Sequence, residues 1–139
     1  MKQSVPQQHE MSCGLACISY ITSIQYDKIA KGEEHLRLTQ RGYSCIALVR
    51  KLDMLGYKYS WRKCTNENVI ANLSTGSIVF VEPSEDLPYG HWLTLAQQGW
   101  MDPWINYASS RDISQAQSGF RESLPGRPSY LVIPRSRMK

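Results

Sequence analysis

The sequence lacks any hydrophobic run long enough to cross a bilayer. Its apolar runs, such as residues 78–81, are far shorter than the roughly 20 residues that a membrane-spanning helix needs. Residues 1–10 are mostly polar and contain neither the apolar core nor the small-residue cleavage site of a secretory signal. We therefore expect a cytoplasmic protein without a transmembrane segment.

Internal repeats and low-complexity stretches are also lacking, which argues against a solenoid or a linker. With 139 residues, the chain is long enough for one hydrophobic core but too short for two comfortable ones. Its 42% hydrophobic and 20% charged residues are ordinary for a globular protein. The sequence therefore predicts a single domain over residues 1–139.

The excess of charge is small, a net +4, but it is unevenly distributed. Five of the 16 basic residues lie after position 120: Arg121, Arg127, Arg135, Arg137 and Lys139. We predict a basic C-terminal tail at about residues 134–139. It is either solvated and frayed or in contact with nucleic acid, anionic lipid or an acidic partner. No nucleic-acid motif accompanies the charge, so no nucleic-acid partner is expected.

Cysteines are few, namely Cys13, Cys17, Cys45 and Cys64. In the absence of an export signal, the reducing cytosol favours free thiols over disulfides. Cys13 and Cys17 have no second close Cys or His pair at the distance typical of a zinc finger. We therefore expect no metal site.

Hydrophobic periodicity predicts two helices in the first half of the chain. Apolar residues recur at spacings of three and four over residues 13–24, which indicates a helix with one buried face, and Ser12 is a plausible cap. A second helix is predicted over residues 43–55, where Gly56 supplies the stop.

The second half of the chain favours strands. Alternating residues over 57–61 predict one strand, and short apolar segments predict others at 78–81, 92–96 and 130–133, with a weaker one near Trp100. A short helix is predicted at 67–73. Helices first and strands afterwards indicate an α+β domain in which N-terminal helices pack on a C-terminal antiparallel sheet.

Cys13 is the candidate nucleophile because it opens the first predicted helix. The unpaired N–H groups and the dipole of a helix N-terminus favour a thiolate, and Gly14 leaves room for a substrate carbonyl. Taken alone, a Cys-Gly pair is more often a packed structural cysteine. A cysteine nucleophile also requires a histidine within hydrogen-bond reach.

His91 is the candidate base because it precedes the apolar segment 92–96, at the mouth of a strand. His9 and His35 lie in polar surroundings and are predicted to be solvated. Asp102 follows His91 by eleven residues, enough for one strand, a turn at 97–99 and the start of the next strand. A hairpin would bring the two side chains together; the alternative is that Asp102 serves only a turn.

These residues form a pattern that resembles the double-glycine leader peptidases, the bacteriocin-processing branch of the bacterial papain-like cysteine peptidases. The resemblance covers residues 7–106 and is carried by Gln7-x5-Cys13-Gly14-x-Ala16-Cys17, Gly90-His91-Trp92 and Asp102-Pro103-Trp104. It implies a papain-like fold. It also implies that His91 is the base, that Asp102 orients His91, and that Gln7 contributes to the oxyanion hole beside backbone N–H groups near Cys13.

The sequence departs from the family pattern at three places. Ser12 stands where the family commonly has an acidic residue, the loop 82–89 is long, and the hairpin between His91 and Asp102 is shorter than usual. Gln8 competes with Gln7 for the oxyanion role, but the spacing favours Gln7. Family members are often fused to an ATP-driven peptide exporter, which makes an exporter a possible partner here.

The remaining cysteines and the tryptophans are predicted to be structural. Cys17 and Cys45 are expected in the core, and Trp92, Trp100 and Trp104 are expected to pack in the core or the hairpin rather than to stack on substrate.

The sequence thus predicts a cysteine peptidase that hydrolyses a peptide bond with Cys13, His91 and Asp102 and needs no cofactor. By the resemblance, it processes a leader peptide or precursor after a small-residue pair such as Gly-Gly. One alternative is a papain-like amidase that acts on cell-wall peptide or another amide. Another is a catalytically idle module that binds a peptide or a partner protein.

Overall fold

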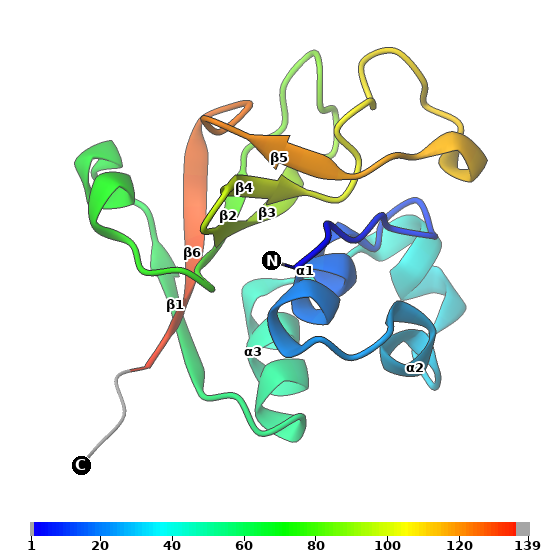
Figure 1. Cartoon of the computed structure of the whole chain (residues 1–139), viewed down its shortest axis with the longest axis horizontal. Helices are drawn as coiled ribbons and strands as arrows, with labels where there is room; N and C mark the ends of the chain where they lie inside the picture. Colours follow the sequence, from blue (N-terminus) through cyan, green and yellow to red (C-terminus); the bar gives the residue numbers. More distant parts are fainter. Residues whose placement is uncertain (1, 136–139) are drawn as a thin grey trace.

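The chain forms a helical half followed by a sheet half (Figure 1). This computed structural model describes residues 2–135, so most of the predicted tail, including Arg137 and Lys139, lies outside the described residues. The helical half contains α1 (Cys13–Thr22), α2 (Tyr26–Ala30), the π-helical turn η1 (Arg37–Arg41) and α3 (Cys45–Met54).

The sheet half contains six antiparallel strands in the order β1-β6-β2-β3-β4-β5. The strands are β1 (Tyr59–Lys63), β2 (Ile78–Val81), β3 (His91–Ala96), β4 (Gly99–Asp102), β5 (Gly119–Arg121) and β6 (Pro128–Pro134), with short 3-10 turns η2 (Glu67–Asn72) and η3 (Ile113–Gln115). Strands β2 to β5 form a meander, and β6 returns to lie between β1 and β2. The predicted order of helices and antiparallel strands is confirmed.

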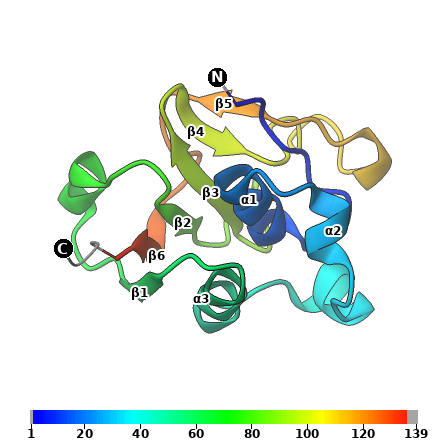
Figure 2. The same cartoon turned by 60° about the horizontal axis from the view of Figure 1, so that its bottom comes forward.

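Helix α1 lies at the centre of the helical half, between β3 on one side and α2 and α3 on the others (Figure 2). All residues from Gly14 to Tyr20 are buried, so the prediction of one buried face is wrong. Neighbours on every side leave this helix no solvated face. It ends at Thr22, two residues before the predicted end, because Ser23 takes a left-handed conformation with φ 61°.

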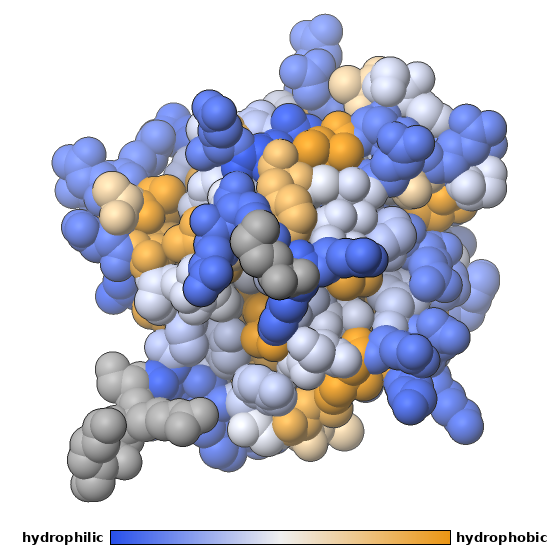
Figure 3. Space-filling model, in the orientation of Figure 1, coloured by the Kyte–Doolittle hydropathy of each residue, from blue (hydrophilic) through white to orange (hydrophobic). Residues whose placement is uncertain are grey.

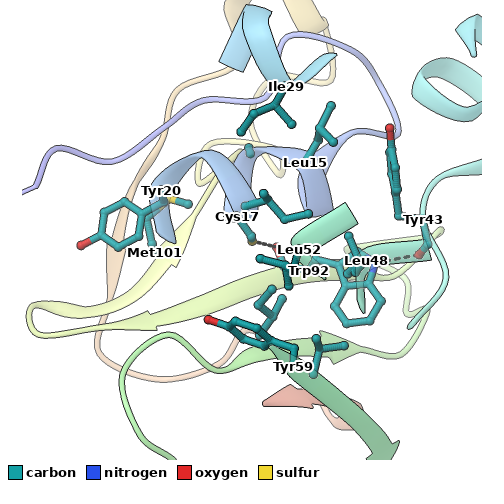
Figure 4. Packing of buried hydrophobic residues seen from close by; sticks show 14 of the residues in the cluster. Leu15, Cys17, Tyr20, Ile29, Tyr43, Leu48, Leu52, Tyr59, Trp92 and Met101 are labelled. Atoms are coloured by element: carbon teal, nitrogen blue, oxygen red, sulfur yellow. Dashed lines mark hydrogen bonds between the residues drawn. The ribbon is translucent and has the colours of Figure 1, made fainter. Parts of the chain in front are cut away.

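The main core lies between these helices and the sheet (Figure 4). Its centre is formed by Leu15 and Cys17 of α1, Leu48 and Leu52 of α3, and Trp92 of β3. Helix α3 covers β1 and β6, while α1 covers β3. Residues 48 and 52 of α3 lie one turn apart and both face this core, which explains the helical spacing of apolar residues in α3.

The opposite face of the sheet is also covered. Val79, Val81, Leu93 and Leu131 form a second buried cluster under η2 and the loops near Leu87. Because both faces are buried, β2 and β3 consist of nearly continuous apolar residues instead of alternating ones. Short unbroken apolar runs therefore identified the central strands correctly.

Several element boundaries differ from the predictions. Helix α3 begins at Cys45, two residues late, because Ser44 caps it by accepting the N–H of Ala47 at 3.1 Å. Strand β1 begins at Tyr59 instead of residue 57, and its Trp61 is 44% exposed. The predicted helix at 67–73 is the 3-10 turn η2.

No sequence pattern predicted α2, η1 or β5, which have five, five and three residues. Periodicity needs a longer window than such segments provide. They form because tertiary neighbours support them; β5, for example, pairs with β4 along Trp100, Met101 and Asp102.

In the face that Figure 3 shows, hydrophobic residues form separate patches among hydrophilic ones. None of the helices within residues 2–135 has the length and hydropathy needed to span a membrane.

Candidate active site

Cys13 is the first residue of α1 and lies half-buried in a cleft beside His91. Its Sγ atom accepts the backbone N–H of Trp92 at 3.4 Å. A Cβ atom on Gly14 would lie 2.8 Å from Cδ2 of the fully buried Leu48. The packing of α1 against α3 therefore requires the small size of Gly14.

His91 and Asp102 form a buried pair at the same end of two adjacent strands. Nε2 of His91 donates to Oδ1 of Asp102 at 2.6 Å, and the two residues are 5% and 1% exposed. The turn between β3 and β4, in which Ala96 pairs with Gly99, brings them together. Because Nε2 is engaged, Nδ1 is the ring nitrogen that remains for Cys13.

The surroundings of His91 favour its protonated form. Burial by itself lowers the pKa of His91. The negative charge of the Cys13 sulfur, the hydrogen bond and charge of Asp102, and a hydrogen bond to Cys13 outweigh burial and raise the pKa from 6.5 to about 10. An imidazolium beside a thiolate is the state that a cysteine nucleophile requires.

Asp102 is held as a carboxylate by three partners. Oδ1 also accepts the backbone N–H of Trp104 at 2.9 Å, and Oδ2 accepts Nε of Arg121 at 2.6 Å. Burial opposes ionisation, but these bonds and the charge of His91 lower the pKa of Asp102 from 3.8 to about 2. A carboxylate with this environment orients the imidazole and does not take its proton.

Arg121 is a site residue that no sequence pattern predicted. It is one of the basic residues near the C-terminus, but it belongs to β5, where its side chain is 32% exposed. Nη2 of Arg121 also donates to the carbonyl of Ile105 at 3.2 Å. The pairing of β4 with β5 brings it to Asp102, and no local sequence pattern signals that pairing.

Gln7 lines the cleft, but its side-chain amide is already engaged. The residue is 2% exposed, and Nε2 donates to the carbonyls of His9 at 3.0 Å and Glu10 at 3.2 Å. Oε1 is buried and has no hydrogen-bond partner among the described residues. The backbone N–H of Gln7 donates to the carbonyl of Pro103 at 3.1 Å, which ties this segment to the Asp102 turn. Gln8 is exposed.

The other two histidines differ from each other. His35 is exposed, as predicted. The prediction that His9 is solvated is wrong, because His9 is half-buried, stacks on Tyr26 with ring centroids 5.9 Å apart, and places Nδ1 2.8 Å from the Tyr26 hydroxyl. The sequence could not reveal this contact, since Tyr26 lies in the short helix α2 that periodicity did not identify.

Ser12 occupies the N-cap position of α1, but its side chain does not cap the helix. The hydroxyl instead donates to the carbonyl of His9 at 3.0 Å and accepts the hydroxyl of Tyr26 at 2.5 Å. The predicted cap is therefore wrong, because Tyr26 and His9 compete successfully for this hydroxyl.

The cleft around Cys13 and His91 has a volume of about 390 Å³. Gly42 and Tyr43 border it on the helical side, and Tyr89, Gly90 and Trp104 border it on the sheet side. Gly90 has φ 71°, and a Cβ atom there would lie 2.2 Å from Cζ of Phe80. Only glycine fits at this position, which sets the start of β3 and hence the place of His91.

The remaining cysteines are unpaired, and two of them are buried. Cys17 is fully buried under Trp92 and donates to its carbonyl at 3.6 Å (Figure 4), and burial raises the pKa of its thiol. Cys45 is buried and Cys64 is half-buried. Among residues 2–135, no three His, Cys, Asp or Glu side chains group as a metal site would require.

Trp92, Trp100 and Trp104 are buried, as expected for packing residues. Nε1 of Trp92 donates to the carbonyl of Tyr43 at 3.0 Å, which joins the two sides of the cleft (Figure 4).

Comparison with known proteins gives a match among solved structures. No family model matches the chain, and no curated protein matches it. The structure is similar to the crystal structure of the peptidase domain of Streptococcus ComA, a bifunctional ABC transporter involved in a quorum-sensing pathway. The TM-score is 0.54 at 15% sequence identity, over 97% of this chain and 100% of that domain. The chain therefore has the α+β papain-like fold that the sequence predicted.

Proposed function

We propose that the protein is a cysteine peptidase in which Cys13 is the nucleophile, His91 the general base and Asp102 the residue that orients His91. The observation that carries this proposal is the bond between Nε2 of His91 and Oδ1 of Asp102 at 2.6 Å, beside the Cys13 sulfur. This bond commits one ring nitrogen to Asp102 and leaves the other for the thiol.

The proposed reaction starts from the ion pair in which the proton of Cys13 has passed to Nδ1 of His91. The sulfur adds to the scissile carbonyl carbon, and the carbonyl oxygen becomes an oxyanion. The oxyanion then collapses, the C–N bond breaks, and His91 gives its proton to the leaving amine. Water, deprotonated by His91, hydrolyses the thioester and releases the carboxylic acid.

The oxyanion would be stabilised by the backbone N–H of Cys13 and by Nε2 of Gln7. Because the amide of Gln7 donates to the carbonyls of His9 and Glu10, this role requires one of its N–H groups to turn to the substrate. The buried position of Gln7 beside the cleft supports its assignment over the exposed Gln8.

The substrate we propose is a peptide precursor that is cut after a small-residue pair such as Gly-Gly. The buried rings of Trp92 and Trp104 border the cleft beside Cys13, and we expect them to disfavour a large substrate side chain there. The sequence resemblance to double-glycine leader peptidases and the fold shared with the ComA peptidase domain support the same class. A peptide exporter is the corresponding partner.

A binding module without catalysis is the second candidate. The contacts of Gln7 favour it. Nε2 of Gln7 is already bonded to the carbonyls of His9 and Glu10, and Oε1 is buried without a partner among the described residues. A protein of this kind would hold a peptide in the same cleft but would not activate Cys13.

The test is the rate at which iodoacetamide alkylates Cys13 as a function of pH, in the native chain and in His91→Ala. Cys64, half-buried and outside the cleft, is an internal reference thiol in the same sample. We expect Cys13 to react at about pH 6 at least tenfold faster than Cys64, because an imidazolium stabilises the thiolate. The His91→Ala variant should lose this difference.

Equal rates for the two thiols in the native chain would reject the peptidase and favour the binding module. If Cys13 is activated, matched peptides with a Gly-Gly or a Val-Val pair test the substrate. We expect cleavage of the Gly-Gly peptide only. Activation of Cys13 without cleavage of either peptide would favour the amidase alternative.

A further inference from the structure

Tyr26 connects α2 to the segment that carries the site. It is 4% exposed, and its hydroxyl donates to Oγ of Ser12 at 2.5 Å. Nδ1 of His9 lies 2.8 Å from the same hydroxyl, and the His9 ring stacks on the Tyr26 ring at an interplanar angle of 22°. Ser12 immediately precedes Cys13, so this buried hydroxyl acts next to the proposed nucleophile.

The protons of this group can be assigned. Tyr26 has one hydroxyl proton, which it donates to Ser12, and Ser12 donates its own to the His9 carbonyl at 3.0 Å. Nδ1 of His9 must therefore carry a proton and donate to Tyr26. The three residues form a closed ring of hydrogen bonds that passes through the backbone of His9, whose N–H also donates to Oγ of Ser12 at 3.2 Å. Both the neutral Nδ1–H tautomer and the cation of His9 satisfy it, so the ring does not depend on the charge of His9.

The ring directs the Ser12 hydroxyl away from α1. A serine at an N-cap position ordinarily accepts the N–H of the second or third helical residue, here Gly14 or Leu15. The side chain of Ser12 makes no such bond. The first-turn N–H groups of α1 consequently keep their capacity to stabilise a thiolate or an oxyanion at Cys13.

We infer that Tyr26 is a positioning residue for the proposed reaction, because it holds the Ser12 hydroxyl off the N-terminus of α1 and leaves those N–H groups free for Cys13 and its substrate. The inference rests on the proposed function for its catalytic meaning. The physical arrangement itself, a serine kept from capping by a tyrosine, can be tested without any activity. Figure 2 shows α2 beside α1, which is the arrangement that this contact requires.

The test uses the full chain and four variants: Tyr26→Phe, Ser12→Ala, the double variant of both, and Tyr59→Phe. Tyr59 is a matched control, because it is a buried tyrosine whose hydroxyl donates to the carbonyl of Gly76 at 2.9 Å and which does not line the cleft. Tyr26→Phe and Tyr59→Phe each remove one buried hydroxyl. They should destabilise the fold to a similar extent.

The first measurement is hydrogen exchange at the amides of Gly14 and Leu15. In Tyr26→Phe the Ser12 hydroxyl keeps only its contacts with the backbone of His9. We expect it to turn and cap α1, so protection of one of these amides should rise at least fivefold. Ser12→Ala, the double variant and Tyr59→Phe should show no such rise. Unchanged protection in Tyr26→Phe would overturn the inference, whatever the activity of the protein.

The second measurement is the alkylation rate of Cys13 by iodoacetamide at about pH 6, relative to Cys64. Tyr26→Phe should lower it about five- to tenfold, and adding Ser12→Ala should restore it, because no hydroxyl is then left to cap the helix. If Tyr26 is only a structural residue, the two substitutions will lower the rate additively and the inference fails. A native chain in which Cys13 is no faster than Cys64 rejects the proposed function, while the exchange result still decides the arrangement around Tyr26.

Discussion

Asp102 accepts hydrogen bonds from three groups around the candidate site. Its two oxygens bind His91, the backbone of Trp104 and Arg121, and the residue is only 1% exposed. A buried carboxylate is costly unless it is paired and hydrogen-bonded. Arg121 therefore contributes to stability through Asp102 as well as to the orientation of His91.

Replacing Arg121 by Met should lower the free energy of unfolding by roughly 2 kcal/mol, since a charge-assisted bond to a buried carboxylate is lost. The matched control is Arg127→Met, which removes an exposed pair with Glu67 at 3.5 Å. Arg127→Met should lower the free energy of unfolding by less than about 1 kcal/mol. Urea unfolding of both variants measures the difference, and equal losses would contradict the role given to Arg121.

The pair of His91 and Asp102 also predicts a pH dependence of stability. The pKa of His91 is raised from 6.5 to about 10, so its contribution is complete below about pH 6.5 and is lost as the pH rises through 10. The pKa of Asp102 is lowered from 3.8 to about 2, so its contribution is present above about pH 4 and is lost as the pH falls through 2.

The difference in unfolding free energy between the native chain and His91→Gln should therefore be largest between about pH 4 and 6.5. The margin should narrow on both the acidic and the alkaline sides of this window. Denaturant titrations of the two proteins across the pH range provide the measurement. A margin that does not change with pH would mean that His91 is not protonated in the folded protein.

At the scale of elements, the start of β3 determines where His91 lies. Gly90 has φ 71°, and its position against Phe80 and the carbonyl of Val81 leaves no space for a side chain. The following strand then runs directly into the hairpin that carries Asp102 on β4. A small backbone feature thus fixes the geometry of the candidate site.

Gly90→Ala should lower stability by more than roughly 3 kcal/mol, because it combines left-handed strain with a steric clash. Gly56→Ala is the matched control. Gly56 has φ 91°, and a Cβ atom there would meet nothing within 4 Å, so only the strain of about 1–2 kcal/mol applies. Thermal unfolding compares the two variants, and similar losses would show that the Phe80 contact yields easily.

At the scale of the whole molecule, the helices and the sheet meet along one core, and the cleft opens where their ends approach each other. The sheet joins this core to the second cluster on its other face, because the central strands contribute residues to both. The single domain over residues 1–139 stays a prediction.

Unfolding in urea should accordingly be one cooperative transition. Tryptophan fluorescence reports mainly on the sheet, which carries Trp92 and Trp100, while far-ultraviolet circular dichroism reports strongly on the helices. The two signals should give the same midpoint. Separate midpoints would indicate two independently folding parts.

The sequence by itself determined the elements with strong local patterns. Helical periodicity identified α1 and α3, and apolar runs identified the central strands, because burial imposes those patterns on neighbouring residues. The spacing between His91 and Asp102 predicted their hairpin, and the two side chains do meet across it. The catalytic roles of Cys13, His91 and Asp102 remain proposals.

Only the tertiary structure decided which distant segments meet around the site. It joined Arg121 to Asp102 through the three-residue strand β5, and it brought Tyr26 to His9 and Ser12 through the five-residue helix α2. Such contacts depend on side-chain chemistry between segments far apart in the chain. They leave no periodic trace in the sequence, because a single hydrogen bond constrains one residue at each end and nothing between them.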